Sequence, residues 1–247
     1  MANETGDMKL LGNFRRFIDR VKDDPKYKPS NTALTGAAMD AQYAAGLAAV
    51  QELTTHVGAN KLAVSERETA FDNLKPLVTR VHNLVKASGA SPSVIEDLNS
   101  FKRKLSGGTR SPKAKPVERS ADAPAEPGNS AKARSSAQTS YDNQIGHLSG
   151  YLAVLEHVAD YNPNEADLKL AALQTLRDAL QSKNDAVSAA SVPVSQARAR
   201  RDELLYNGED SIVNTALLAK NYVSAAYGRS SQIYKDVATL SFKRAQK

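Results

Sequence analysis

The chain has 247 residues, 41% of them hydrophobic, a formal net charge of +6, and neither cysteine nor tryptophan. The missing cysteine excludes disulfides, thiolate metal sites and cysteine nucleophiles, and the length allows one large domain or two domains of roughly 100 residues. The N-terminus lacks the basic start and apolar run of a secretory signal, and no stretch approaches the ~20 apolar residues of a membrane span. We therefore expect a cytoplasmic protein, with signal-independent export left open.

Hydrophobic spacing predicts helices from the start of the chain. Residues 10–24 carry apolar side chains at i, i+3, i+4 and i+7, and a proline follows directly. After the turn at Tyr27-Lys28-Pro29, Ser30 or Asn31 is expected to cap a long alanine-rich helix that reaches about residue 57.

Glycines and prolines predict where the next helices begin and end. Gly58-Ala59-Asn60 is expected to break or bend the chain before a third helix over 62–87. Ser88-Gly89 supplies its C-cap, and Ser91-Pro92 starts a short fourth helix, with Ser91 as N-cap and Pro92 at the first helical position.

The same order of helices is predicted from residue 140 onward. Asn164 is expected to cap the second helix, Pro193 to mark the turn after it, and Asn207-Gly208 to disturb the third helix. No period-2 alternation of apolar residues favours a strand. The four predicted helices cover about residues 140–159, 164–190, 194–226 and 231–242.

Two segments of the chain share a pattern. Tyr27-Lys28-Pro29-Ser30-Asn31 matches Tyr161-Asn162-Pro163-Asn164-Glu165 at an offset of 161 − 27 = 134, and Gly89 matches Gly228 at 228 − 89 = 139. Self-similarity of this kind predicts a duplicated unit. We expect an all-α protein in which a first repeat (1–105) and a second repeat (140–247) pack as a pseudo-twofold helical bundle.

Residues 106–139 separate the two repeats and have a different composition. Six bases stand against three acids there, four prolines interrupt the segment, and Val117 is its one large aliphatic residue. Such a segment buries too little apolar surface to offset its ordering entropy, so we expect a flexible, disordered basic linker.

No residue pattern points to catalysis. None of the four histidines (His56, His82, His147 and His157) is paired with another at ligand spacing, no Glu-x-x-His pair suits a di-iron bundle, and no phosphate-binding loop is present. Acidic pairs such as Asp202-Glu203 follow arginines and are interpreted as solvated, ion-paired helix surfaces. We therefore expect a protein that is not an enzyme and has no metal or cofactor.

The two Tyr-x-Pro corners are the best candidates for a site, because both repeats contain them. Tyr27 with Pro29, and Tyr161 with Pro163, have two interpretations. In the structural one, proline fixes φ, tyrosine packs over the turn, and the next polar residue caps a helix. In the functional one, each corner binds a partner.

Basic residues of the linker and of the clusters that end each repeat are candidates for phosphate contacts and support a nucleic-acid-associated protein as the alternative function. Several of them end short helices, where cations also complement the helix dipole. No aromatic residues are interleaved with the linker bases for stacking, so nucleic acid is not the favoured partner. The candidates are Lys102, Arg103, Lys104, Lys113, Lys115, Lys243 and Arg244.

As a set, these features resemble a family of internally duplicated, all-helical bacterial proteins to which no activity is attached. The resemblance covers nearly the whole chain except the linker, and it implies the architecture and a bacterial origin but no catalytic residues. Its matching residues are Tyr27, Pro29, Leu34, Phe71, Arg80, Tyr161-Asn162-Pro163-Asn164-Glu165, Asn184, Pro193, Ala197-Arg198, Arg201, Leu205-Tyr206, Tyr227-Gly228 and Ser231.

Alanine-rich helices favour a self-associating structural or scaffold protein, expected to be a homo-oligomer. In the first repeat, small residues form a stripe on one face of the second helix. If the third helix covers this stripe, the opposite side, Ala38 to Ala49, is left for another subunit. The stripe consists of Ala37, Ala41, Ala44, Ala45 and Ala48.

Overall fold

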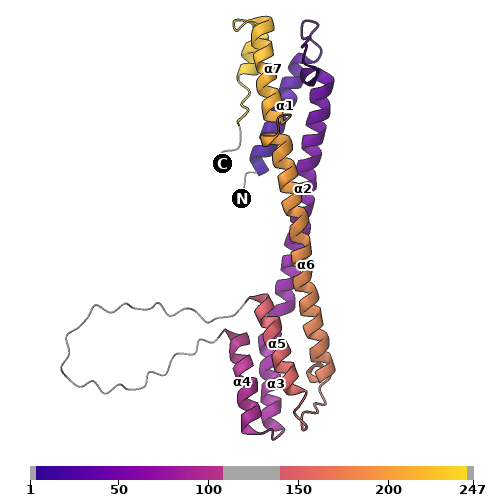
Figure 1. The fold of residues 1–247 in the computed structure, drawn as a ribbon, viewed down its shortest axis with the longest axis vertical. Coiled ribbons are helices and arrows are strands. Elements are labelled where there is room, and N and C mark those ends of the chain that lie inside the picture. Colours follow the sequence, from indigo (N-terminus) through magenta and orange to yellow (C-terminus); the bar gives the residue numbers. More distant parts are fainter. Residues whose placement is uncertain (1–3, 108–139, 244–247) are drawn as a thin grey trace, which may run out of the picture. The chain divides into compact units, whose positions relative to one another are not determined.

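A computed structural model describes residues 4–107 and 140–243, in which every regular element is helical and none is a strand (Figure 1). The all-α prediction is confirmed for these residues. Most of the predicted linker, and with it Lys113, Lys115 and Arg244, lies outside them. The elements are α1 (Glu4–Val21), η1 (Thr32–Leu34), α2 (Gly36–Asp72), α3 (Leu74–Ala87), α4 (Pro92–Ser106), α5 (Tyr141–Leu155), η2 (Ala166–Leu168), α6 (Leu170–Asp202), η3 (Glu203–Asn207), α7 (Ile212–Tyr227) and α8 (Gln232–Ala238).

Two predicted helix breaks are wrong. Helix α2 continues through Gly58 and ends only at Asp72, and α6 continues through Pro193 to Asp202. A glycine costs a helix only about 1 kcal/mol, and Gly58 is exposed with open space around it. Proline removes the bond to the carbonyl four residues earlier, but that residue, Ala189, is exposed, so water can bond to its carbonyl. Packing of Leu53 against Val194 and Ala197 holds both helices together across these residues.

Several predicted helix ends agree with the observed ones. Ser91 caps α4 with Pro92 at the first helical position, and Gly89 has a φ of 84° after the C-cap of α3. Ser231 caps α8, which ends at Ala238 rather than near residue 242. The expected disturbance at Asn207-Gly208 is confirmed as a turn of π-helix, η3.

The predicted caps of the two long helices differ from those observed. Asn31 caps the short 3-10 helix η1, and α2 begins five residues after Asn31, at Gly36. In the second repeat, Glu165 rather than Asn164 precedes η2, and its side chain makes no capping bond. A 3-10 turn therefore separates each Tyr-x-Pro corner from its long helix, which the sequence pattern did not predict.

The described chain forms two compact units that do not coincide with the predicted domains. Unit 1 comprises Met1–Leu62 and Ser188–Lys247, and unit 2 comprises Ala63–Val187, so the boundaries fall inside α2 and α6. Each unit combines the first part of one predicted repeat with the last part of the other. No local pattern indicates this exchange, because hydrophobic periodicity shows which face of a helix is buried but not which helix buries it.

The core of unit 1 is formed by α1, one face of α2 and the chain after α6. Phe14, Phe17 and Ile18 of α1 are fully buried and pack in the same cluster as Val213 and Val223 of α7. The backbone of α1 lies close to both α7 and α8.

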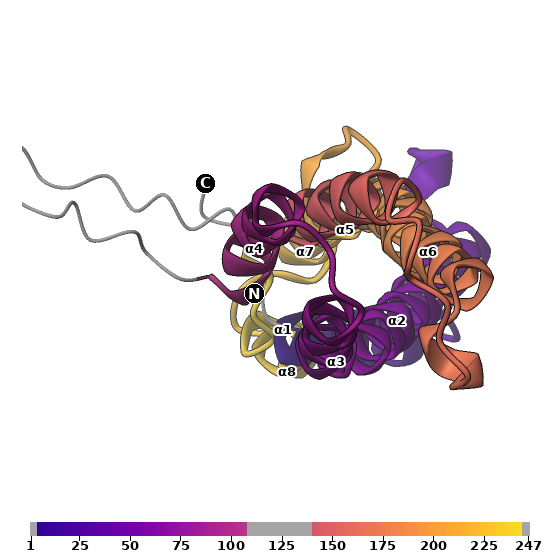
Figure 2. The same ribbon diagram turned by 90° about the horizontal axis from the view of Figure 1, so that it is seen from below.

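The core of unit 2 lies around α4. Helix α4 packs against both α3 and α5, which is visible when the helices are viewed end on (Figure 2). Leu98 and Leu105 of α4 are buried with Val85 of α3 and Leu148 of α5.

Among the described residues, no helix combines the length and apolar character that crossing a membrane requires.

Candidate functional sites

The corner of unit 1 is held by the tyrosine that the sequence singled out. Tyr27 is buried, and its hydroxyl donates a hydrogen bond of 2.9 Å to the carbonyl of Leu34, seven residues later. The Tyr27 ring meets the edge of Tyr222 from α7, with centroids 5.2 Å apart. Burial, followed by the nearby Tyr222, raises the pKa of Tyr27 to about 12, so its hydroxyl stays protonated and able to donate.

The corner of unit 2 has the same bond. The Tyr161 hydroxyl donates to the carbonyl of Leu168 at 2.5 Å, again seven residues later, and Leu168 is buried. Burial, then the nearby Glu165 and Asp167, raises the pKa of Tyr161 to about 12. Pro29 is half-buried and Pro163 is buried. These contacts favour the structural interpretation of both corners, since each hydroxyl is occupied inside its own unit.

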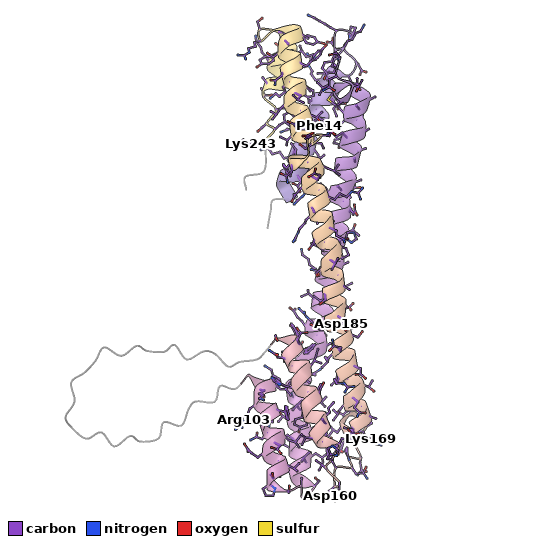
Figure 3. The ribbon with its side chains drawn as sticks, in the orientation of Figure 1. Phe14, Arg103, Asp160, Lys169, Asp185 and Lys243 are labelled. Atoms are coloured by element: carbon purple, nitrogen blue, oxygen red, sulfur yellow. The ribbon has the colours of Figure 1, made fainter. Side chains whose placement is uncertain are left out.

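The described basic candidates lie at two separate places. Arg103 and Lys104 occupy the last turn of α4, and Arg103 pairs with Glu96 on the same helix at 3.3 Å. The Lys104 ammonium lies 5.5 Å from the ring centroid of Phe101, and Lys102 is half-buried. Lys243 is exposed at the end of the described chain in unit 1, after the buried Phe242 (Figure 3). The described candidates are therefore divided between the C-terminal part of α4 in unit 2 and the end of the described chain in unit 1.

A buried ion pair in unit 1 was missed from the sequence. Arg201 donates to Asp7 at 2.6 Å, and the side chains are only 6% and 4% exposed. Arg201 also pairs with Asp202 at 2.8 Å, and the Tyr206 hydroxyl donates to the other oxygen of Asp7 at 2.6 Å. The interpretation of this arginine-rich stretch as a solvated surface is therefore wrong for Arg201.

Neighbouring charges and burial shift the pKa values of Arg201 and Tyr206 in this cluster. Burial by itself lowers the pKa of Arg201, but Asp7 and Asp202 outweigh that effect and hold the pKa above its ordinary value. Burial and the bond to Asp7 raise the pKa of Tyr206. In this cluster the Asp7 carboxylate accepts hydrogen bonds from a guanidinium and a phenol, and the π-helix η3 places Tyr206 one turn beyond Arg201.

Unit 2 has an arginine at the matching position of the first repeat. Arg67 donates to the side-chain oxygen of Asn184 at 3.2 Å, and Asn184 donates in turn to Asp142 at 2.7 Å. The guanidinium lies 4.0 Å from the ring centroid of Tyr141. A buried amide and an aromatic face replace the direct carboxylate contact of unit 1. The offset of 134 matches Arg67 with Arg201 in the sequence, but it does not indicate the partners of either arginine.

The alanine stripe of α2 is open to solvent in unit 1. Every exposed residue of α2 between Gly36 and Ala49 is an alanine, and together these residues are the stripe identified in the sequence. Ala49 and Met39, on the other side, are buried in the unit. The expectation that the Ala38–Ala49 side remains free is therefore wrong. That side packs in the core because Gly46 has no side chain and leaves room for Ile212 and Leu11. Side-chain atoms of these two residues lie 2.6 Å and 3.1 Å from the position that a Cβ on Gly46 would occupy.

No three His, Cys, Asp or Glu side chains within residues 4–107 and 140–243 gather as a metal site requires. Comparison with protein-family models, with curated proteins and with solved structures finds no match to this chain. The bacterial family resemblance stays a prediction, and the exposed alanine face of α2 is the surface feature that most needs a functional explanation.

Proposed function

We propose that this protein is a non-enzymatic structural protein that associates with itself through the alanine face of α2, defined by Ala37, Ala41, Ala44, Ala45 and Ala48. The observation that carries the proposal is the exposure of all five alanines, with no other exposed residue between them. A helix face that meets only solvent normally carries charged and polar side chains. Small side chains on a charge-free face instead permit unusually close approach of a second helix.

The size of this face suits one helix of a second copy. It extends over 48 − 37 = 11 residue steps, roughly 16 Å at 1.5 Å per residue. The corresponding face of α6 is less uniform, since exposed Ala171, Thr175 and Ala179 are joined there by Asp178, which pairs with Arg177 at 2.7 Å. A charge at that position opposes close helix contact. We therefore assign self-association to the α2 face.

Analytical ultracentrifugation of nucleic-acid-free protein at several concentrations tests this function. We expect the wild-type weight-average mass to rise with concentration. Ala41→Glu and Ala45→Glu place a charge on the face but not in the core, so both variants should stay monomeric with unchanged helicity and melting temperature. Ala153→Glu, at an exposed alanine of α5, is the matched control and should associate like the wild type.

Two results would oppose the proposal. A strictly monomeric wild type rejects association through this face. Monomeric protein that binds duplex DNA with a steep salt dependence would instead support the alternative, a nucleic-acid-associated protein.

We also propose that the chain is an internal duplication with pseudo-twofold character. The same seven-residue hydrogen bond at Tyr27 and Tyr161 supports it, as does the placement of Arg67 and Arg201 134 residues apart. Each core draws on both repeats. A protease site inserted between residues 108 and 139 tests whether the two repeats share their cores. After cleavage the two fragments should co-elute in gel filtration until denaturant is added. Separation of the fragments under native conditions would contradict shared cores.

A further inference from the structure

Two histidines of unit 2 lie on the helices that flank α4. His82 belongs to α3 and is 1% exposed, and His147 belongs to α5, with its Nε2 atom buried. Helix α4 packs against both of these helices. The other two histidines differ, since His157 is exposed and His56 is half-exposed, 4.0 Å from Glu52.

Buried nitrogens of both rings lack hydrogen-bond partners within the described residues. Both ring nitrogens of His82 and the Nε2 atom of His147 have no hydrogen-bond partner there. A neutral imidazole already carries one N–H that needs an acceptor, and an imidazolium carries two. Protonation therefore adds a buried charge and a further donor at a place where no acceptor stands ready.

The charged groups around both rings are mostly cationic. His82 faces Lys102 and Glu96 from α4 and Lys86 from its own helix, and His147 faces Lys104 from α4. Burial first, and then these lysines, lower the pKa of both histidines, with Glu96 a weaker opposing influence on His82. Both rings are therefore neutral at neutral pH.

We propose that His82 and His147 form an acid-sensitive latch on α4, such that protonation of both rings loosens α4 from α3 and α5 while unit 1 stays folded. The inference stands independently of self-association through α2. A histidine harder to protonate in the folded state than in the unfolded chain stabilises the fold fully above its unfolded value, about 6.5. That stabilisation declines as the pH falls below this value, so α4 loosens in mild acid.

Helix α4 is the element that moves, because it carries the opposing lysines. Lys102 and Lys104 both lie in its C-terminal part. Moving α4 outward relieves the repulsion and hydrates both rings at the same time. It also uncovers the apolar contacts of Leu98 and Leu105, which are buried in the closed state. Acid would thus expose a hydrophobic surface between α3 and α5.

Hydrogen exchange of the full-length protein, read by mass spectrometry and corrected for intrinsic rates, tests the latch. Between about pH 7.5 and about pH 5, we expect α4 peptides to lose roughly tenfold or more in protection. Peptides of α1 and α7 should keep theirs and serve as the internal reference. Asp19, Asp24 and Asp236 of unit 1 have pKa values held below the ordinary range by hydrogen bonds, so these three carboxylates do not titrate in this interval.

Variants separate the latch from general acid sensitivity. A His82→Leu/His147→Gln double variant should show the same α4 protection at both pH values, whereas His157→Gln should behave like the wild type. His147→Gln alone, which spares the tightly packed His82, should show a smaller acid response and keeps the test valid if His82→Leu fails to fold. Unchanged α4 protection in the wild type would overturn the proposal. So would an equal loss in the double variant, or equal loss across α3, α4 and α5.

Discussion

Arg201 in unit 1 and Arg67 in unit 2 occupy matching positions in the two predicted repeats, yet different groups contact the two guanidinium groups. Arg201 meets two carboxylates, Asp7 and Asp202. Arg67 meets the ring of Tyr141 and the amide of Asn184, and the carboxylate of Asp142 lies one hydrogen bond further away. The comparison shows that arginines at matching positions, one buried and one half-buried, are held by different partners: carboxylates in unit 1, and an amide and an aromatic face in unit 2.

The largest difference should appear when each arginine is removed. Arg201→Met leaves Asp7 as a buried carboxylate without its cation, and breaking such a pair costs about 3–5 kcal/mol. We expect this loss in the free energy of unfolding by urea titration followed by circular dichroism, with hydrogen exchange locating it in unit 1. A second variant, Asp7→Asn/Arg201→Met, removes both charges and keeps an acceptor for Tyr206, so it should recover much of the loss. A single variant as stable as the wild type would contradict a buried pair.

Close helix contact in unit 2 provides the next comparison, between two glycines of α5. A Cβ on Gly150 would collide with the ring of Phe101, whereas a Cβ on Gly146 has open space. Gly150→Ala should therefore destabilise by about 1–3 kcal/mol through overpacking. Gly146→Ala should stabilise by up to about 1 kcal/mol, because alanine favours the helix. Thermal unfolding should show a lower melting temperature for Gly150→Ala and a higher one for Gly146→Ala. Equal shifts in melting temperature would show that Phe101 does not pack on α5.

Removal of Arg67 should cost less than removal of Arg201. Arg67→Met forfeits a cation–π contact and one bond to an amide, together about 0.5–2 kcal/mol, but leaves no directly paired carboxylate bare. Urea unfolding of this variant beside Arg201→Met gives the ranking directly. A loss from Arg67→Met as large as that from Arg201→Met would mean that Asp142 carries the main interaction in unit 2.

The smallest effects should come from the two corners, and they should be alike. Tyr27→Phe and Tyr161→Phe each remove one hydrogen bond to a carbonyl, worth about 0.5–1.5 kcal/mol. A corner that binds a partner would instead show little change in stability and a loss of binding. Thermal melting of the two variants checks both the size and the similarity of the effects.

The same tyrosines give a pH prediction. Because the folded pKa of each is about 12, above the unfolded value near 10, the stability that they contribute is complete below about pH 10. It is lost as the pH rises from there through about 12. Absorbance near 295 nm, compared between the wild type and each Tyr→Phe variant, reports these late titrations, and ionisation of either residue near pH 10 would contradict its buried hydrogen bond.

Local features were predictable because they depend on a few neighbouring residues. The Ser91-Pro92 start, the Gly89 stop and the disturbance before Gly208 all follow from backbone preferences within one turn. The helix breaks at Gly58 and Pro193 were mispredicted for the same reason. A glycine or a proline has a local cost, but contacts among Leu53, Val194 and Ala197 offset it.

Of the candidate sites, the sequence likewise predicted those marked by a local pattern and missed the one that depends on a distant residue. The tyrosine corners were visible because their spacing is repeated, and the structure adds the hydrogen bond that explains it. Arg201 was placed on a solvated surface because its neighbours are charged. Its burial depends on Asp7, 194 residues away in the chain, which no local pattern reveals.

By itself, the sequence determined that this chain is helical, where its apolar faces lie, and that its corners recur. Only the tertiary structure decided which faces meet: α1 with α7 and α8 in unit 1, and α4 with α3 and α5 in unit 2. It also decided that Ala49 is buried and the alanine face of α2 is open. The physical reason is that helix periodicity is set within a few residues by hydrogen bonding and side-chain spacing, whereas the choice of partner depends on the shape of side chains brought together from distant parts of the chain.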